Sequence, residues 1–507
     1  MKLLKFQKPA QYVGGEFFSI TKNWHEIPKK VLLVVPTTYE ISGNSLGINF
    51  LYKAINSRKD SLCERVYFPL EDYKKYLFET KKVLTSLESH RRADEFDILL
   101  FSLSSRYAVL NIFEMFELLG ISCEKKPVCI AGGVATMNFA PFENFFDAFV
   151  VGDGEEVVGK ILDIFSQNRE NFLSEISKIE GVYVKGISKK VKKRFSPLKT
   201  EYYPLTPIIP NIRTFQNRLD IEIMRGCPNN CAFCEARKFY SPLRIRKPDE
   251  VVWLVEESIK NTGWEGISFL SLSTSQYPYL IEVVSRILPL LKRKAISLQI
   301  PSLRPDIKSL ECILKILELN QVNITFAPET FSKRLQKKIS KETSFEEFEN
   351  VLKELKKAGF PDAKIYLLIG LPGEEEDDIA ETIKAVKELS KIGLKLKISL
   401  SIFVPAPHTP FQDEKIFPVD RLEAHIEKFK TSMKRVALKL PDISYALIES
   451  AITTGDENVG KILLNLKGRD IFSVSRWREE FSKLGIDFDE YIRRDFVGYY
   501  PWSKVIV

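Results

Sequence analysis

The sequence lacks any apolar run long enough to cross a membrane. Its longest apolar stretches, such as residues 365–371, have the length of a strand, whereas a spanning helix needs roughly 18 residues. The N-terminal segment MKLLKFQKPAQYVGGEF breaks its apolar run too early to act as a secretory signal. We therefore expect a cytoplasmic protein with no membrane partner.

Histidine is scarce, and cysteine is unevenly placed. There are four His residues, so a metal site has to rely on other ligands. Of the seven Cys residues, Cys227, Cys231 and Cys234 are clustered, whereas the others are scattered. An odd, clustered set in a chain without an export signal favours thiolate ligation of a metal centre over a disulfide framework.

The charge balance excludes a strongly acidic or strongly basic protein. The net charge of +8 comes from 75 Lys and Arg against 67 Asp and Glu in 507 residues. This excess permits a polyanionic partner such as RNA without indicating one. The hydrophobic content of 44% is enough for several cores, and the length predicts about three or four domains.

Strand-like apolar runs alternate with helical patterns in the first third of the chain. The runs lie at residues 31–36, 97–105, 128–133 and 146–156. This order predicts an α/β fold with a doubly wound, Rossmann-like domain over residues 31–167, preceded by an N-terminal arm at 1–30. Ligands of such a domain bind beyond the C-terminal ends of the strands.

The pattern loosens between the first domain and the next. Residues 168–215 contain prolines and one alternating stretch, GVYVKGISKKVKKRF, which predicts a linker with a β-hairpin. The basic run Lys189–Arg194 lies at the tip of that hairpin. It is read first as a solvated surface and second as a contact for an anionic partner.

A second series of β/α units follows the linker. The predicted strands are residues 219–226, 266–273, 296–302, 323–329, 363–370 and 397–404. Six such units predict a partial (β/α)6 TIM-like barrel over residues 216–411, whose chemistry belongs on the loops at the C-terminal strand ends. Residues 412–507 are predicted to form a small, mostly helical C-terminal region.

The segment RGCPNNCAFC at 225–234 has the spacing Cys-x3-Cys-x2-Cys directly after the first barrel strand. Cys227, Cys231 and Cys234 can therefore hold three irons of a [4Fe–4S] cluster and leave the fourth iron open to another ligand. A structural zinc ion would need a fourth protein ligand, and no further Cys or His stands nearby in the sequence.

On these residues the sequence resembles the radical S-adenosylmethionine (SAM) superfamily from about 219 to 410, with Phe233 as the aromatic residue before the third Cys. The resemblance implies that SAM chelates the open iron. It also implies that an external donor such as flavodoxin or ferredoxin supplies an electron, which cleaves SAM to methionine and a 5′-deoxyadenosyl radical.

The resemblance also implies a SAM pocket at the other strand ends. The segment SLSTS at 271–275 stands where the family often has a GGE sequence, and its hydroxyls would meet the SAM ammonium group; a plain polar turn is the alternative. Arg334 would meet the SAM carboxylate or be surface charge, and Gly370 would lie along adenine. The predicted SAM contacts are Phe233, Ser271, Ser273, Thr274, Ser302, Glu329, Arg334 and Gly370. No catalytic acid or base is predicted.

A doubly wound domain before such a barrel resembles the cobalamin-dependent class of the superfamily. The residues that would approach cobalamin are Ser102, Ser104, Gly132, Gly133 and Gly152. The first loop, PTTYEISGNSLG, has no His in any register of the Asp-x-His-x-x-Gly pattern, so no cobalt ligand is expected from it. The alternative is a degenerate domain that serves as a lid or substrate platform.

Three functions are compatible with these patterns. The first is a cobalamin-dependent radical SAM enzyme that methylates an unactivated carbon. The second is a cobalamin-independent hydrogen abstraction or rearrangement by the same cluster. The third is an RNA- or ribosome-associated binding module that uses Lys189–Arg194 together with Arg244, Arg246 and Lys247, which are otherwise a solvated basic surface. The substrate is not identified by the sequence.

Overall fold

The computed structural model describes residues 3–507 except 122–126, 318, 320–323, 435 and 467. The chain forms two compact units. Unit 1 comprises residues 1–217, 451–491 and 496–507, and unit 2 comprises residues 218–450 and 492–495. Among the described residues, no helix is both long and apolar enough to span a membrane.

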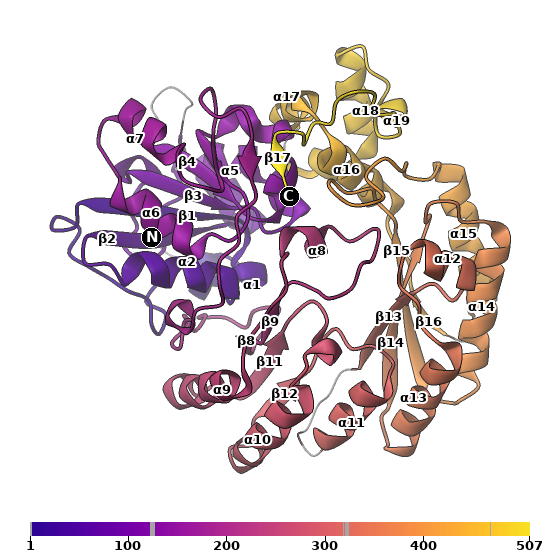
Figure 1. Ribbon diagram of the computed structural model, residues 1–507. Coiled ribbons are helices and arrows are strands. Elements are labelled where there is room, and N and C mark those ends of the chain that lie inside the picture. The colour runs from indigo at the N-terminus through magenta and orange to yellow at the C-terminus, as the bar shows by residue number, and fades with distance from the viewer. Residues whose placement is uncertain (1–2, 122–126, 318, 320–323, 435, 467) are drawn as a thin grey trace. The chain divides into compact units, whose positions relative to one another are not determined.

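Unit 1 is built on a six-stranded sheet (Figure 1). In order across the sheet, the strands are β2 (Ser61–Phe68), β1 (Lys29–Thr38), β3 (Ile98–Ser102), β4 (Val128–Gly132), β5 (Ala148–Val150) and β6 (Val182–Val184). The first five are parallel and β6 is antiparallel to β5. The strand order reverses between β1 and β3, which makes this the doubly wound domain that the sequence predicts.

Helices cover this sheet because its strands are apolar on both faces. Val31–Val35 of β1 are almost completely buried, as expected for a parallel strand between two layers. The helices of the N-terminal part are α1 (Tyr39–Ser42), α2 (Leu46–Asn56), α3 (Glu71–Glu79), α4 (Arg106–Leu110), α5 (Ile112–Leu118), α6 (Glu155–Asp163) and α7 (Arg169–Ile176).

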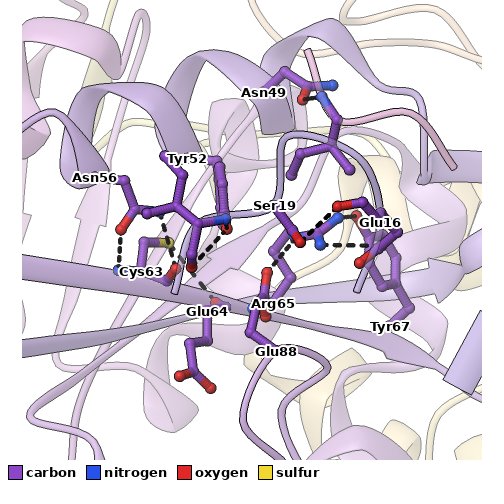
Figure 2. Close-up of polar contacts among 12 residues, drawn as sticks. Glu16, Ser19, Asn49, Tyr52, Asn56, Cys63, Glu64, Arg65, Tyr67 and Glu88 are labelled. Carbon is purple, nitrogen blue, oxygen red and sulfur yellow. Dashed lines mark hydrogen bonds and ion pairs between the residues drawn. The ribbon is translucent and has the colours of Figure 1, made fainter. Parts of the chain in front are cut away.

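A buried ionic cluster ties the N-terminal arm to the edge strand β2 (Figure 2). The Arg65 side chain is fully buried and lies 3.0 Å from Glu16 Oε1 and 2.7 Å from Glu88 Oε1. The Tyr39 hydroxyl donates to the same Glu16 oxygen. Burial raises the pKa of Glu88, and Arg65 opposes that rise. This cluster holds the arm against the sheet.

The predicted hairpin over residues 181–195 is wrong. Strand β6 pairs with β5, and β7 (Val191–Lys192) pairs in parallel with β17 (Val505–Ile506) at the C-terminus. The reason is burial: all three residues of β6 are buried, so this segment extends the large sheet instead of folding back on its neighbour.

The residues predicted to form one C-terminal region, 412–507, are divided between the two units. The helices of this region are α15 (Val419–Ser432), α16 (Ile443–Thr454), α17 (Glu457–Asn465), α18 (Val474–Lys483) and α19 (Phe488–Tyr491). Helix α17 packs on the 3-10 helix η5 (Ala140–Phe145) of unit 1. A Cβ atom at Gly460 would lie 2.0 Å from the Pro141 carbonyl oxygen, so this close approach requires glycine.

Unit 2 contains a three-stranded and a four-stranded parallel sheet. The strands are β8 (Leu219–Glu222), β11 (Gly266–Leu270) and β12 (Ser297–Gln299), followed by β13 (Thr325–Glu329), β14 (Asp362–Ile369), β15 (Lys395–Ile402) and β16 (Ala437–Lys439). The expected partial barrel is confirmed, and β16 adds a strand to the six predicted ones.

Helices cover one face of these strands (Figure 1). They are α9 (Pro248–Thr262), α10 (Leu280–Arg293), α11 (Ile307–Lys315), α12 (Lys333–Lys338), α13 (Phe345–Lys357), α14 (Glu376–Ser390) and the already defined α15. Burial alternates along β14: Ile365 and Leu367 are buried, whereas Lys364 and Tyr366 are half-buried. The strands therefore turn one face to the helices and a more open, polar face inward.

Candidate functional site

The three clustered cysteines lie on a loop at the C-terminal end of β8. The chain passes through β9 (Met224–Arg225), which pairs with β10 (Arg244–Ile245), and enters α8 (Glu235–Phe239) after Cys234. Gly226 opens the loop with a left-handed φ of 91°, and a Cβ there would lie 2.9 Å from the Leu243 Cα. Only glycine fits this position, so the backbone fixes where the cysteines begin.

The thiols of Cys227, Cys231 and Cys234 are free and partly accessible. Burial raises the pKa of Cys231 and Cys234; the Lys341 ammonium opposes this rise, and the neighbouring thiols add to it. Among the described residues, no set of three or more Cys, His, Asp or Glu side chains is gathered around a point that suits a single metal ion. A [4Fe–4S] cluster needs no such point, because each thiolate binds a different iron.

The predicted aromatic residue Phe233 is brought next to predicted Glu329. Lys341 links them: its ammonium lies 2.7 Å from Glu329 Oε1 and 6.0 Å from the centre of the Phe233 ring. Glu329 ends β13 with a left-handed φ of 67°, and Ser302, beyond β12, has a φ of 56°. Such strain in residues other than glycine is typical of functional sites. Lys341, which lies 12 positions from Glu329, is not among the site residues that the sequence predicts.

The hydroxyls after β11 form their own hydrogen bonds. Ser271 Oγ lies 2.8 Å from Thr274 Oγ1, and Ser273 donates to Gln276 Oε1 at 2.7 Å. The 3-10 helix η7 (Thr274–Gln276) holds them in a tight turn at the end of β11. The polar-turn interpretation therefore describes these contacts, and the hydroxyl oxygens keep lone pairs for a further donor.

The Arg334 side chain is engaged at the start of α14. It is half exposed, pairs with Asp378 and donates to the Gly373 carbonyl at 2.8 Å. It thus joins α12 to the first turn of α14.

Gly370 ends β14 with a left-handed φ of 73°. Its N–H donates to Glu374 Oε1 at 2.8 Å, and His425 Nδ1 lies 2.9 Å from the same oxygen. Glu374 and His425 are both buried, so α15 fixes the loop after β14.

The residues predicted to approach cobalamin divide into two groups. Ser102 and Gly132 are register partners at the ends of β3 and β4, and Ser104 is exposed beside them. The space beside Gly133 and Gly152 is instead occupied by the protein's own backbone. A Cβ at Gly133 would lie 2.5 Å from the Leu103 oxygen, and one at Gly152 would lie 1.9 Å from the Arg194 oxygen. The strand ends that remain available to a ligand are therefore the C-terminal ends of β3 and β4.

Two of the predicted basic residues have internal roles. Arg246 is buried, pairs with Glu250 and donates to the Glu222 carbonyl at 3.0 Å. Arg194 lies 2.7 Å from Glu156. By contrast, Lys189 and Lys190 are exposed. The basic run thus contributes to packing as well as to the surface.

Two family models match the chain. Residues 47–185 match the N-terminal domain of radical SAM proteins, and residues 221–386 match the radical SAM superfamily. A curated relative, protein MJ0966 of Methanocaldococcus jannaschii, is 27% identical over 86% of this chain and 90% of its own length.

Two solved structures share the fold. The radical SAM methyltransferase TsrM from Kitasatospora setae, with its tryptophan substrate and a SAM analogue bound, has a TM-score of 0.53 at 15% identity, covering 76% of this chain and 75% of TsrM. The cobalamin-dependent radical SAM enzyme OxsB, with aqua-cobalamin bound, has a TM-score of 0.53 at 14% identity, covering 90% of this chain and 72% of OxsB. The predicted order of a doubly wound domain followed by a partial barrel is thereby confirmed, whereas the chain forms two compact units instead of the three or four domains that its length predicts.

Proposed function

We propose that this chain, which is a two-domain radical SAM enzyme, cleaves SAM reductively and uses the 5′-deoxyadenosyl radical to activate an unreactive C–H bond. A [4Fe–4S] cluster, when bound, supplies the electron for this cleavage. We assign its three protein ligands to Cys227, Cys231 and Cys234. The observation that carries the proposal is the loop itself: three free, partly accessible thiols follow the first barrel strand on a backbone that Gly226 shapes.

The protein residues would bind and orient SAM around this loop. The hydroxyls of Ser271, Ser273 and Thr274 present acceptors for the ammonium group, and the segment at Gly370 would lie along adenine. Ser302, Glu329 and Phe233 complete the set. Arg334 is not assigned to SAM, because its guanidinium pairs with Asp378 of α14 and donates to the carbonyl of Gly373, which precedes that helix.

The finer proposal is methylation of the substrate carbon with the help of cobalamin, which carries the methyl group when bound. Its support is the fold shared with TsrM and OxsB and the reversal of strand order between β1 and β3. The residues that would contact this cofactor are Ser102, Ser104 and Gly132, at the C-terminal ends of β3 and β4. Gly133 and Gly152 would not.

The second candidate is hydrogen abstraction without cobalamin. It is favoured by one observation, the packing of Gly133 and Gly152 against the backbone of Leu103 and Arg194, because this packing removes two of the five residues that the cofactor was expected to approach. In this case unit 1 would act as a lid or a substrate platform.

The test is an anaerobic incubation of reconstituted protein with SAM and a strong reductant, with and without methylcobalamin, followed by mass spectrometry. We expect 5′-deoxyadenosine in both cases, and S-adenosylhomocysteine only with cobalamin if methylation is the reaction. Absence of 5′-deoxyadenosine from protein that holds iron would contradict the proposal.

The ligand assignment is tested with a single substitution. Cys231→Ala is expected to lower the iron content and abolish 5′-deoxyadenosine formation, because a cluster iron loses its thiolate. Cys312→Ala is the matched control: Cys312 is buried in α11, so its loss should leave iron and product unchanged. Equal iron contents in the two variants would refute the assignment.

A further inference from the structure

We propose that Asn229 sets the reduction potential of the cluster through a hydrogen bond to the Cys227 sulfur. The proposal rests on the proposed function, since it needs a cluster on the cysteine loop. Asn229 lies between two of the ligand cysteines and was not singled out by the sequence. Its amide nitrogen Nδ2 lies 3.4 Å from Cys227 Sγ, a distance that suits an N–H···S hydrogen bond.

The orientation of the Asn229 amide is fixed by its partners. Arg304 Nη1 donates to Asn229 Oδ1 at 3.0 Å. A guanidinium can only donate, so the atom that faces Arg304 must be the oxygen and the atom that faces Cys227 must be the NH2 group. The flip that is usually ambiguous for an asparagine is therefore decided by chemistry.

The second hydrogen of the amide is held as well. Asn229 Nδ2 also donates to Gln276 Oε1, which accepts from Ser273 too. One amide hydrogen is directed to Gln276. The other faces both the Ser273 hydroxyl oxygen and the Cys227 sulfur, each 3.4 Å from Nδ2, and a cluster-bound thiolate is the stronger acceptor of the two because it is charged. Thus Asn229 presents a directed donor to one ligand of the cluster and has little freedom to turn away.

The network spans three loops of unit 2. Asn229 belongs to the loop after β8, Gln276 to the turn after β11, and Arg304 to the segment after β12. Arg304 is itself anchored, because its Nη2 donates to the Glu342 carbonyl at 3.0 Å and its N–H donates to Ser275 Oγ at 3.0 Å. The donor is therefore pre-positioned by the fold and does not depend on the short loop alone.

A hydrogen bond to a ligating sulfur favours the reduced cluster. Reduction adds one negative charge to the cluster and its thiolates, and an N–H dipole that points at a sulfur stabilises that charge. Removing the donor should therefore make the cluster harder to reduce. Asn230, the next residue, has a different role: its Oδ1 accepts from Arg237 Nη2 in an exposed contact.

The experiment compares Asn229→Leu, Asn229→Ala and the matched control Asn230→Ala in the reconstituted full-length protein. The midpoint potential is measured by a redox titration followed by electron paramagnetic resonance of the reduced cluster, with iron content as the check on occupancy. We expect both Asn229 variants to have about tenfold less reduced cluster at a fixed potential, which equals a shift of about −59 mV for one electron. The control should keep the wild-type potential.

The inference would be overturned by a wild-type potential in an iron-replete Asn229 variant, or by an equal shift in Asn230→Ala. The two replacements differ in volume, so a cluster lost from one by poor packing can still be titrated in the other. Loss of iron from both, with full iron in Asn230→Ala, would also overturn it, because Asn229 would then be needed for assembly. If wild-type protein cleaves SAM and any one of these three outcomes is found, only the role of Asn229 fails. A wild-type protein without iron would refute the proposed function and this inference together.

Discussion

Replacing Asp220 with Asn should remove a pH dependence of stability that this single carboxyl confers on unit 2. Asp220 lies in β8, the strand that leads into the cysteine loop, and is 8% exposed. Burial raises its pKa to about 7 from an ordinary value of 3.8, and Arg218 only partly opposes this rise. The folded protein therefore holds a proton on Asp220 at pH values where the unfolded chain has lost it.

The sign and size of the effect follow from this difference. A carboxyl whose pKa is higher in the folded state stabilises the fold fully below the unfolded pKa, and this contribution is lost as the pH rises through the folded pKa. Each unit of difference corresponds to about 1.4 kcal/mol, so the loss between pH 4 and pH 7 is about 3 kcal/mol. Between pH 5.5 and pH 8 it should be about 2 kcal/mol.

The assay is urea unfolding at pH 5.5 and pH 8, followed by tryptophan fluorescence. Trp253 and Trp264 report on unit 2, and the other tryptophans lie in unit 1. We expect wild-type unit 2 to lose about 2 kcal/mol more than Asp220→Asn over this pH range, because the amide cannot ionise. Parallel losses in the two proteins would show that Asp220 ionises normally and would refute the reasoning.

Two predictions concern unit 1 and are also measured by urea unfolding. Arg65→Met should lower the free energy of unfolding by about 3–5 kcal/mol at pH 7, because it leaves Glu16 and Glu88 buried without their cation. The control Arg92→Met removes an exposed ion pair with Asp94 and should leave the free energy of unfolding unchanged. Equal losses in the two variants would contradict the role of the buried cluster. Gly460→Ala should cost about 1–3 kcal/mol because the new Cβ meets the Pro141 oxygen. The control Gly159→Ala lies in α6, where nothing is within 4 Å of the new Cβ, and should stabilise the protein by up to about 1 kcal/mol. If Gly460→Ala is as stable as the wild type, α17 can shift to make room for the Cβ.

The cysteine loop could be predicted from the sequence because its chemistry is local. Cys227 and Cys234 are separated by only seven positions, and the strand before them alternates apolar and acidic residues. The doubly wound sheet was predictable for the same reason, since each strand carries its own pattern. Features that depend on contacts between residues far apart in the sequence have no such local pattern and could not be predicted. Asn229 and Arg304 are 75 positions apart, and nothing near either residue indicates the other.

The prediction of a hairpin was wrong because local alternation of apolar and polar residues does not determine which strand a segment pairs with. The segments at β6 and β7 alternate as a hairpin would, yet β6 finds the open edge of β5, and β7 finds residues near the C-terminus. Joining β5 buries all three residues of β6, which an isolated two-stranded ribbon would leave exposed to water, whereas β7 forms a separate two-stranded pair with β17. The sequence pattern predicts the strands but not the strands they pair with, because pairing depends on the rest of the fold.

The strained residues of unit 2 argue that its strand ends are specialised. Ser302, Glu329 and His408 have left-handed φ values between 56° and 67°, a conformation that costs each about 1–3 kcal/mol outside glycine. All three follow the C-terminal part of a barrel strand or end one, on the edge that carries the cysteine loop. Glycine adopts this backbone conformation without strain, so the presence of other residues here points to a use for their side chains. Glu329 already shows such a use, because it holds Lys341 beside Phe233 and the cysteine loop.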